Sequence, residues 1–380
     1  MPGQPLFQSP SASAGRGPSG LSRRGFLGRL AASSALLGVA GCGAGGAGGE
    51  ATVAPPGTVG RAALLAPLSG PQASIGQIMR EAASLGGAVG GPGAEIDLRD
   101  AGTTEQSAVD AARQAVEAGA AMILGPLFSG QSRAVAQAVG RKVPVVSFSN
   151  DSAIAGGNLY VYGVTPLQSA KSVMGFAAAR GLRRIAVVAP PGEFGTRSVA
   201  AAQAAAQGYG IALSEPVVTD SAEGLAARLS AASGGQLPDA VYLPSVRGGF
   251  EAQAAAISAA GVQILGSDQW AAITPQRIPA LQGAWFAAPD PIGFEAFAIA
   301  LEERVETEAG IVAGLAFDAI EMARLLGRLG QQSAEGLQRP AGFSGVLGPY
   351  KILPSGLVER GLAVLNVADG ATTLIGAPSV

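Results

Sequence analysis

The chain has 380 residues, which exceeds one ordinary domain, so two domains with accessory segments are expected. Apolar residues make up 48% of the chain, and this excludes a wholly disordered protein. With no histidine and one cysteine, the sequence excludes the usual catalytic triad, the His-Glu-x-x-His zinc site and a disulfide framework. A formal charge of −2 gives no electrostatic reason to expect nucleic acid as a partner.

Residues 1–41 have the layout of a secretory signal. They contain four arginines and no acid, and they lead into the apolar run 30–40. This run is too short to span a bilayer as a stop-transfer helix. The segment 22–27, which contains Arg23 and Arg24 followed by Phe-Leu, resembles the twin-arginine export motif. We therefore predict a twin-arginine signal peptide over 1–41.

The single cysteine, Cys42, follows this signal directly. The segment Val-Ala-Gly-Cys at 39–42 resembles a bacterial lipobox, in which the cysteine carries the lipid after cleavage. A buried structural thiol is the alternative, but Cys42 ends an apolar signal and begins a glycine tract. We predict a lipid anchor at Cys42 with no redox role. Because the arginines of the signal are removed, membrane attachment would rest on acyl chains alone.

A Gly, Ala and Pro segment follows the cysteine. Residues 42–59 contain one acid and two valines, a composition that buries too little surface to order itself. We predict a flexible tether over this range.

From residue 61, short apolar runs of strand length alternate with Ala-rich stretches of helical period. This pattern is typical of βα units with a parallel sheet, and it predicts an α/β protein with two doubly wound units. In the first unit we predict strands at 62–65, 96–98, 121–124 and 143–146 and helices at 75–85, 105–118 and 132–139. In the second we predict strands at 185–189, 211–218, 240–243, 263–265 and 284–287 and helices at 195–207, 221–232 and 250–260.

After residue 290 the pattern changes to two long helices and two late strands. The helices are predicted at 295–308 and 313–329, and the strands near 346–352 and 362–367. Elements left over at the end of a chain must join sheets already begun. The chain is therefore expected to cross between the two units more than once.

Ligands of open α/β sheets bind beyond the carboxyl ends of the strands, so the strand-to-helix junctions hold the candidate residues. A serine or asparagine there offers a hydroxyl or amide, free N–H groups at a helix start hold a carboxylate, and an acid on the opposite unit meets an ammonium. Such a site suits a zwitterion. The junctions at 67–71, 125–130, 147–151 and 266–270 contribute Ser69, Ser129, Gly130, Ser149, Asn150, Asp151, Asp268 and Trp270.

Each candidate also has a structural interpretation. For Ser129 and Ser149, capping of the helix that follows is the favoured interpretation, and capping is compatible with ligand binding. For Asp268 and Trp270 a structural role is equally compatible with the sequence: Asp268 would be an acid in a turn, and Trp270 an aromatic residue of the core beside it.

Enzymatic functions have little support in the sequence. The chain has no Gly-x-Ser-x-Gly elbow, no G-x-x-x-x-G-K-[ST] phosphate loop and no histidine to activate a serine. None of the three lysines stands at a motif spacing from a junction serine. We predict no catalytic residue, no cofactor and no metal site.

Several motifs together resemble a known family. The segments 65–71, 124–129 and 143–150 are similar to those of the leucine-binding-protein family of type I periplasmic solute-binding proteins. They are closest to its alphaproteobacterial branch of penicillin-binding protein activators. Gly-Glu-Phe-Gly at 192–195 resembles the family's Tyr-Gly loop, and 357–361 adds a further match. The resemblance covers roughly residues 60–370.

This resemblance implies two lobes joined by three crossovers, with a small ligand in the cleft between lobes that close on it. Lobe one would comprise 60–165 plus 291–358, and lobe two 166–290 plus 359–380. In amino-acid-binding members, residues at the positions of Ser129 and 149–151 hold the ligand's carboxylate and ammonium. An aromatic at the position of Phe194 lines the cleft, and an acid at that of Asp268 meets the ammonium.

The sequence departs from the family pattern at two of these positions. Asp151 stands where a hydroxyl residue is expected, and Phe194 replaces the more usual tyrosine. Both departures argue against a standard branched-chain amino acid as the ligand.

Two functions follow as expectations. The first is a periplasmic, lipid-anchored solute-binding protein that holds a small polar or zwitterionic ligand such as an amino acid for an ABC importer. The second is a lipoprotein of the penicillin-binding protein activator type, which would dock on a peptidoglycan synthase.

Overall fold

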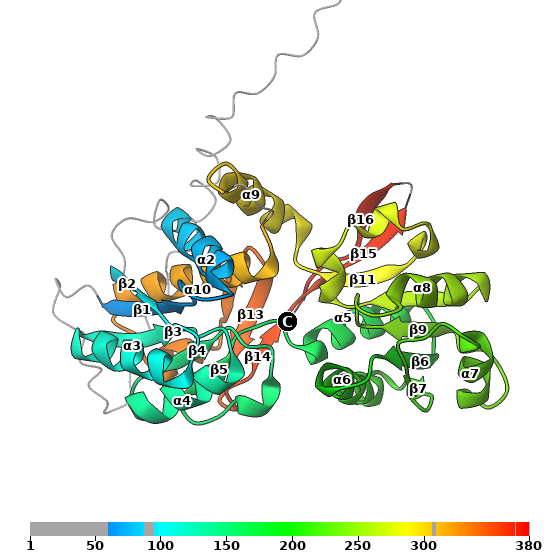
Figure 1. The fold of residues 1–380 in the computed structure, drawn as a ribbon, viewed down its shortest axis with the longest axis horizontal. Helices are drawn as coiled ribbons and strands as arrows, with labels where there is room; N and C mark the ends of the chain where they lie inside the picture. The colour runs from blue at the N-terminus through cyan, green and yellow to red at the C-terminus, as the bar shows by residue number, and fades with distance from the viewer. Residues whose placement is uncertain (1–59, 87–94, 306–308, 369, 380) are drawn as a thin grey trace, which may run out of the picture. The chain divides into compact units, whose positions relative to one another are not determined.

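The computed structural model describes residues 60–86, 95–305, 309–368 and 370–379. The predicted signal and tether, with Arg23, Arg24 and Cys42, lie outside the described residues. Within the described part the protein is a mixed α/β structure built around two large sheets and one small sheet (Figure 1).

The first lobe is built on a five-stranded parallel sheet in the order β2-β1-β3-β4-β5. The strand β1 is apolar along its length and buried from its second residue on, as expected for a strand covered on both faces. The predicted strands of this unit are all present, and β5, which the sequence pattern did not indicate, completes the sheet. The strands are β1 (Arg61–Ala66), β2 (Glu95–Asp100), β3 (Ala120–Leu124), β4 (Val145–Ser147) and β5 (Leu159–Val161).

Helices cover both faces of this sheet (Figure 1). Alternate residues of one strand enter different cores: Leu64 packs with α2 and α10, and Leu65 packs with α3 and α4. The helices of this lobe are α2 (Ala73–Leu85), α3 (Glu105–Glu117), α4 (Ser129–Val139), α9 (Pro291–Glu302), α10 (Ile311–Arg328) and α11 (Ala334–Leu337).

A small antiparallel sheet completes the first lobe. It has the order β12-β13-β14 and consists of β12 (Phe343–Gly345), β13 (Gly348–Ile352) and β14 (Val358–Arg360). Arg360 is buried against Asp318 of α10, with 3.7 Å between Nη1 and Oδ2, and its guanidinium faces the rings of Tyr162 and Tyr350. Asp318 also accepts hydrogen bonds from the backbone N–H groups of Val346 and Leu347. One buried carboxylate therefore ties a helix to the turn and edge of this sheet.

The second lobe is built on an eight-stranded sheet in the order β16-β15-β11-β10-β9-β6-β7, with β8 also paired to β6. The pairs from β7 to β11 are parallel, and β15 and β16 are antiparallel. The strands are β6 (Arg184–Ala189), β7 (Ala212–Leu213), β8 (Val217–Val218), β9 (Ala240–Leu243), β10 (Gln263–Gly266), β11 (Trp285–Ala288), β15 (Ala363–Ala368) and β16 (Ala371–Gly376).

This second sheet is also covered on both faces. The helices α5 (Pro166–Ala179) and α6 (Glu193–Tyr209) pack on one face, and α7 (Leu225–Ala232) and α8 (Phe250–Ala259) pack on the other. Short 3₁₀ turns lie at Ser152–Ile154, Asp268–Ala272, Pro275–Arg277 and Pro279–Leu281.

The chain passes between the large sheets three times. It leaves the first after β5, returns after β11, and crosses again after β14. This is the topology of two doubly wound units with three crossovers that the family resemblance implies. The residue boundaries of the lobes stay a prediction.

The single strand predicted at 211–218 was wrong. The structure has two short strands, β7 and β8, which pair with different parts of β6. Pro216 lies between them and has no N–H to donate to the ladder, so the strand is interrupted there.

The helix α5 was absent from the predicted elements. Pro166 is its first residue, and Gln168 Oε1 accepts a hydrogen bond from the backbone N–H of Thr165. Proline at the first helical position and a side chain that reaches back to the cap residue are both signals of a helix start. The signal was therefore present in the sequence.

Candidate ligand-binding site

The carboxyl ends of β4, β9 and β10 contribute to one small hollow between the two lobes, which we call the interlobe hollow. Its empty space is about 200 Å³, and it is too narrow for a water molecule. Three of the residues predicted from sequence, Asn150, Phe194 and Asp268, line it together. The remaining lining residues are Val164, Pro166, Ser198, Tyr242, Pro244, Ser267 and Gln269.

Asp268 is the carboxylate residue that lines this hollow. It follows β10 and is only 6% exposed. Its carboxylate accepts hydrogen bonds from the hydroxyl of Ser169 on α5 and from Nε2 of Gln269 at 3.3 Å. Among the described residues, no lysine or arginine forms an ion pair with it. Burial raises the pKa of Asp268 to about 6, although both hydrogen bonds act to lower it.

Two hydroxyl groups of the hollow lack partners. Within the described part of the chain, neither Oγ of Ser198 nor the phenol oxygen of Tyr242 has a hydrogen-bond partner, and both residues are fully buried. Burial, and then the charge of Asp268, raise the pKa of Tyr242, so its hydroxyl stays protonated. A buried hydroxyl without a partner costs free energy, and a bound polar group would supply the missing bond.

Asp151 lies beside the hollow and is paired across the lobes. Its Oδ1 lies 3.5 Å from Nη1 of Arg197 on α6, and the same nitrogen lies 3.6 Å from Oε1 of Glu193. Asp151 also accepts a hydrogen bond from the backbone N–H of Ala153. The acid that the sequence placed near the ligand carboxylate is therefore already matched by a cation from the other lobe.

Sequence reasoning missed Arg197, Ser198, Ser169 and Tyr242. Arg197 and Ser198 follow Phe194 by three and four residues on α6, so all three belong to one face of that helix. This spacing is the signal that would have found the first two. Ser169 falls on the helix α5 that was not predicted, and Tyr242 falls inside the strand predicted at 240–243, where only the residues after the strand were considered as candidates.

The other predicted residues lie outside the interlobe hollow. Ser129 is half-buried and is the first residue of α4, whose cap position is Phe128, so Ser129 does not cap this helix. At Gly130 the carboxylate of Glu105 occupies the space a side chain would need. Ser149 Oγ accepts a hydrogen bond from the backbone N–H of Asp151 and holds the turn that follows β4.

Ser69 and Trp270 also lie apart from it. Ser69 is exposed, and Asp100 is its side-chain hydrogen-bond partner at the end of β2. Trp270 is completely buried in the second lobe, where Nε1 donates to the backbone oxygen of Leu243 at 3.1 Å. Its ring stacks on Phe286 with 5.7 Å between centroids. Of its two proposed roles, the structure places Trp270 in that of a core aromatic.

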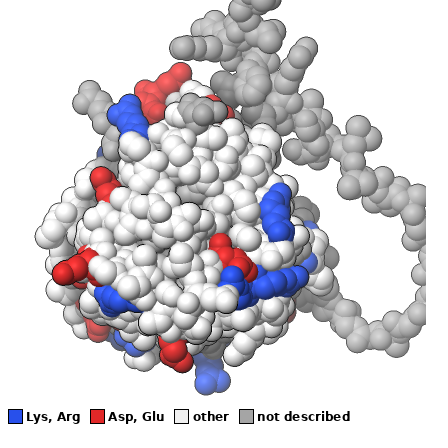
Figure 2. Space-filling model, turned by 90° about the vertical axis from the view of Figure 1, so that its right-hand side faces the viewer, with Lys and Arg blue, Asp and Glu red and all other residues white. Residues whose placement is uncertain are grey.

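Surface charge, helix length and the acidic and cysteine side chains add three observations. On the face that carries α7 and α8, acidic and basic side chains are scattered without a continuous patch of one sign (Figure 2). Among the described helices, none is both long and apolar enough to cross a membrane. The same part of the chain has no cluster of three or more acidic or cysteine side chains placed to hold a metal ion.

Comparison with known proteins agrees with this geometry. A model of the family described as periplasmic binding protein matches residues 61–337. The chain belongs to this family. It is of the type I, leucine-binding-like kind, and membership implies a periplasmic location. None of the curated proteins has a significantly matching sequence.

Solved structures of similar fold come from two functional groups. A protein from Rhodospirillum rubrum, described as a branched-chain amino acid ABC transporter, shares 21% identity and a TM-score of 0.71, over 84% of this chain and 100% of that one. The leucine-binding protein LivK from Thermotoga maritima shares 20% identity and a TM-score of 0.57, over 84% and 99%. Full-length LpoA from Haemophilus influenzae shares 18% identity and a TM-score of 0.67, over 84% and 59%. At these identities the likeness concerns the fold.

Proposed function

We propose that this protein is a lipid-anchored, extracytoplasmic solute-binding protein that holds a small polar or zwitterionic ligand, such as an amino acid, for an ABC importer. The observation that carries the proposal is the buried carboxylate of Asp268, which has no cation partner among the described residues. Beside it lie the unpartnered hydroxyls of Ser198 and Tyr242. A ligand ammonium would pair with Asp268, and ligand polar groups would satisfy the hydroxyls.

Entry of this ligand requires the lobes to separate, because the hollow is too narrow for a water molecule as it stands. The segments that join the lobes are few, and hinge motion about such segments is the usual way this kind of site opens. Closure on the ligand would then bury it between Asn150 of the first lobe and Asp268 of the second.

A ligand screen tests this function. The mature protein should show a thermal shift with at least one compound in a panel of amino acids, short peptides and related metabolites. Asp268→Asn should abolish that shift, whereas Asp110→Asn, on the exposed surface of α3, should preserve it. A panel without any shift, or an unchanged response in Asp268→Asn, contradicts the proposal.

The membrane anchor is a separate part of the proposal, supported by the sequence around Cys42. Mass spectrometry of the protein from its native membrane should find acyl chains on Cys42, and Cys42→Ala should release the protein into the soluble fraction. Replacing Arg23 and Arg24 by lysine should block export. An unmodified Cys42 in exported protein contradicts the anchor.

A second function, regulation of peptidoglycan synthesis through a penicillin-binding protein, is favoured by one observation. The hollow is narrow and bridged beside its edge by Asp151 and Arg197, as expected of a site that has lost its ligand. Crosslinking in cells should then recover a peptidoglycan synthase, and Asp268→Asn should leave that complex unchanged. Failure to recover a synthase under crosslinking excludes this function. We propose no catalytic role in either case.

A further inference from the structure

A second, larger cavity lies away from the interlobe hollow, on the side of α5 that faces the crossing segments. Its volume is about 510 Å³, within the range of small-molecule sites. We call it the hinge cavity, because Thr165 of the first crossing and Leu362 of the third both line it. Ser152 and Leu357 contribute from the first lobe, so its wall includes residues of both lobes.

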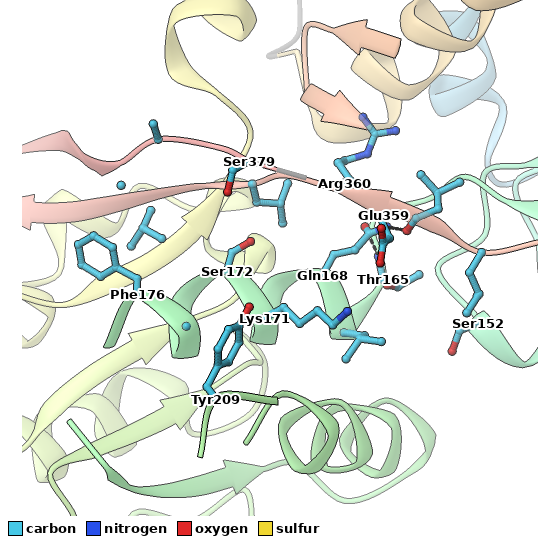
Figure 3. A pocket seen from close by; sticks show the side chains of 18 of the residues that line it. Ser152, Thr165, Gln168, Lys171, Ser172, Phe176, Tyr209, Glu359, Arg360 and Ser379 are labelled. Atoms are coloured by element: carbon cyan, nitrogen blue, oxygen red, sulfur yellow. Dashed lines mark hydrogen bonds between the residues drawn. The ribbon is translucent and has the colours of Figure 1, made fainter. Parts of the chain in front are cut away.

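One end of the hinge cavity is aromatic. Phe176 and Tyr209 lie at this end in Figure 3. Each ring sits over a glycine: a Cβ at Gly175 would lie 2.7 Å from Cζ of Tyr209, and a Cβ at Gly376 would lie 2.8 Å from Cδ2 of Phe176. Glycine within a helix costs about 1 kcal/mol relative to alanine, so Gly175 is a costly residue in α5. The two glycines therefore let these rings pack closely against α5 and β16, and the guanidinium of Arg180 lies over the Phe176 ring, with 3.4 Å from Cζ to the ring centroid.

The other end carries a free cation. Lys171 projects from α5 along the cavity toward the side of Thr165 and Ser152 (Figure 3). It is exposed and forms no ion pair with another described residue. Gln168, Lys171 and Gly175 follow one another at helical spacing, so one face of α5 runs from the cation to the aromatic end.

The wall has two other charged residues, Arg360 and Glu359. Arg360 is buried against Asp318, and its side chain points away from the cavity in Figure 3. Glu359 stands directly opposite Lys351 in the pairing of β14 with β13, and no ion pair joins the two among the described residues. Because Arg360 is paired with Asp318, Lys171 is the cation of the wall that is left for an occupant to pair with.

We propose that the hinge cavity binds a small anionic amphiphile, with an apolar body against Phe176 and Tyr209 and a single carboxylate at Lys171. The site is distinct from the interlobe hollow and does not depend on the function proposed for it. Because both lobes line the cavity, an occupant would restrain their relative motion as well as bind.

Titration calorimetry of the mature protein tests this with 4-phenylbutyrate, decanoate and the uncharged 4-phenylbutanol. We expect 4-phenylbutyrate or decanoate to bind. The one that binds more tightly shows whether the apolar part of the natural ligand is aromatic or aliphatic. The alcohol should bind about tenfold more weakly, because it forfeits a charge-assisted hydrogen bond. Lys171→Gln should cause a similar loss, and Lys142→Gln, an exposed lysine before β4, should cause none.

Trp285 provides a second measurement, because its ring meets that of Phe176 with 5.2 Å between centroids. Binding should change tryptophan fluorescence, and Trp285→Phe should remove the signal while the heat of binding remains. Asp268→Asn should leave binding intact. The proposal is overturned if neither carboxylate binds at millimolar concentration, if Lys171→Gln binds as wild type does, or if Asp268→Asn abolishes binding.

Discussion

Arg197 of the second lobe and Asp151 of the first approach within 3.5 Å, beside the interlobe hollow. Their side chains are 28% and 12% exposed, so the pair is partly shielded from water. Nε of Arg197 is buried and has no hydrogen-bond partner among the described residues. This ion pair joins the two lobes. Each of its residues is the sequence neighbour of a residue that lines the hollow, because Asp151 follows Asn150 and Arg197 precedes Ser198.

Breaking this pair should loosen the lobes more than it destabilises the fold. Partly exposed ion pairs contribute about 1 kcal/mol or less to the free energy of unfolding, so Arg197→Gln should shift the urea midpoint only slightly. Small-angle X-ray scattering of the ligand-free protein should show a larger radius of gyration. Arg133→Gln, an exposed arginine on α4, removes the same charge and should leave the radius unchanged. Equal radii for both variants would show that the pair does not hold the lobes together.

Asp268→Asn should stabilise the ligand-free protein at neutral pH. The pKa of Asp268 is about 6 in the folded state, above the ordinary value of 3.8, so the folded protein holds this proton more tightly than the unfolded chain. The contribution of Asp268 to stability is complete below pH 4 and is lost as the pH rises through 6. The variant avoids this loss. Its free energy of unfolding should exceed that of the wild type by roughly 2 to 3 kcal/mol above pH 7 and should equal it near pH 4. Urea unfolding at both pH values measures the difference, and a gain that does not depend on pH contradicts the assignment.

Tyr242→Phe should separate stability from ligand binding. The hydroxyl has no hydrogen-bond partner among the described residues, so its removal should change the free energy of unfolding by less than about 0.5 kcal/mol or raise it slightly. If a ligand supplies the missing bond, its affinity should fall about tenfold. Denaturation and calorimetry on the same variant give both values. A loss of more than about 2 kcal/mol in stability would mean that the hydroxyl is already satisfied in the ligand-free protein.

Two glycines of α6 should respond to alanine in opposite directions. A Cβ at Gly195 would lie 1.8 Å from the backbone oxygen of Pro190, so Gly195→Ala must displace the start of the helix that carries Phe194 and Arg197. We expect a loss of about 2 kcal/mol or more. A Cβ at Gly208 would have no other atom within 4 Å, so Gly208→Ala should raise the free energy of unfolding by about 0.5 to 1 kcal/mol. Thermal unfolding measures both, and equal effects would contradict the packing described for the start of α6.

The buried pair of Asp318 and Arg360 should be costly to break from one side. Arg360→Met leaves the carboxylate of Asp318 buried without its cation, and we expect a loss of about 3 to 5 kcal/mol. The double variant Asp318→Asn/Arg360→Met removes both charges and should recover much of that loss. A double variant as unstable as the single one would show that the packing of the arginine against Tyr162 and Tyr350 matters more than its charge.

The βα alternation and the family could both be predicted from the order of the residues alone. The spacing of apolar residues along a segment shows which of its faces is buried. Because this spacing is a local property of the sequence, most strands and helices could be predicted at their observed positions. The place of Asn150 and Asp268 in the lining of the interlobe hollow has a related reason. In a parallel sheet, chain order alone places the residue after a strand at the ligand-binding edge.

The contacts between residues of the two lobes could be learned only from the three-dimensional fold. The ion pair of Asp151 with Arg197 and the hydrogen bond of Ser169 to Asp268 each join segments that are far apart in the chain. No local sequence pattern predicts contacts over such separations. The same holds for Trp270, whose ring turns into the core although its neighbour Asp268 faces the hollow. The direction of a side chain in a short 3₁₀ turn depends on what packs against the turn. That packing is set by the whole fold.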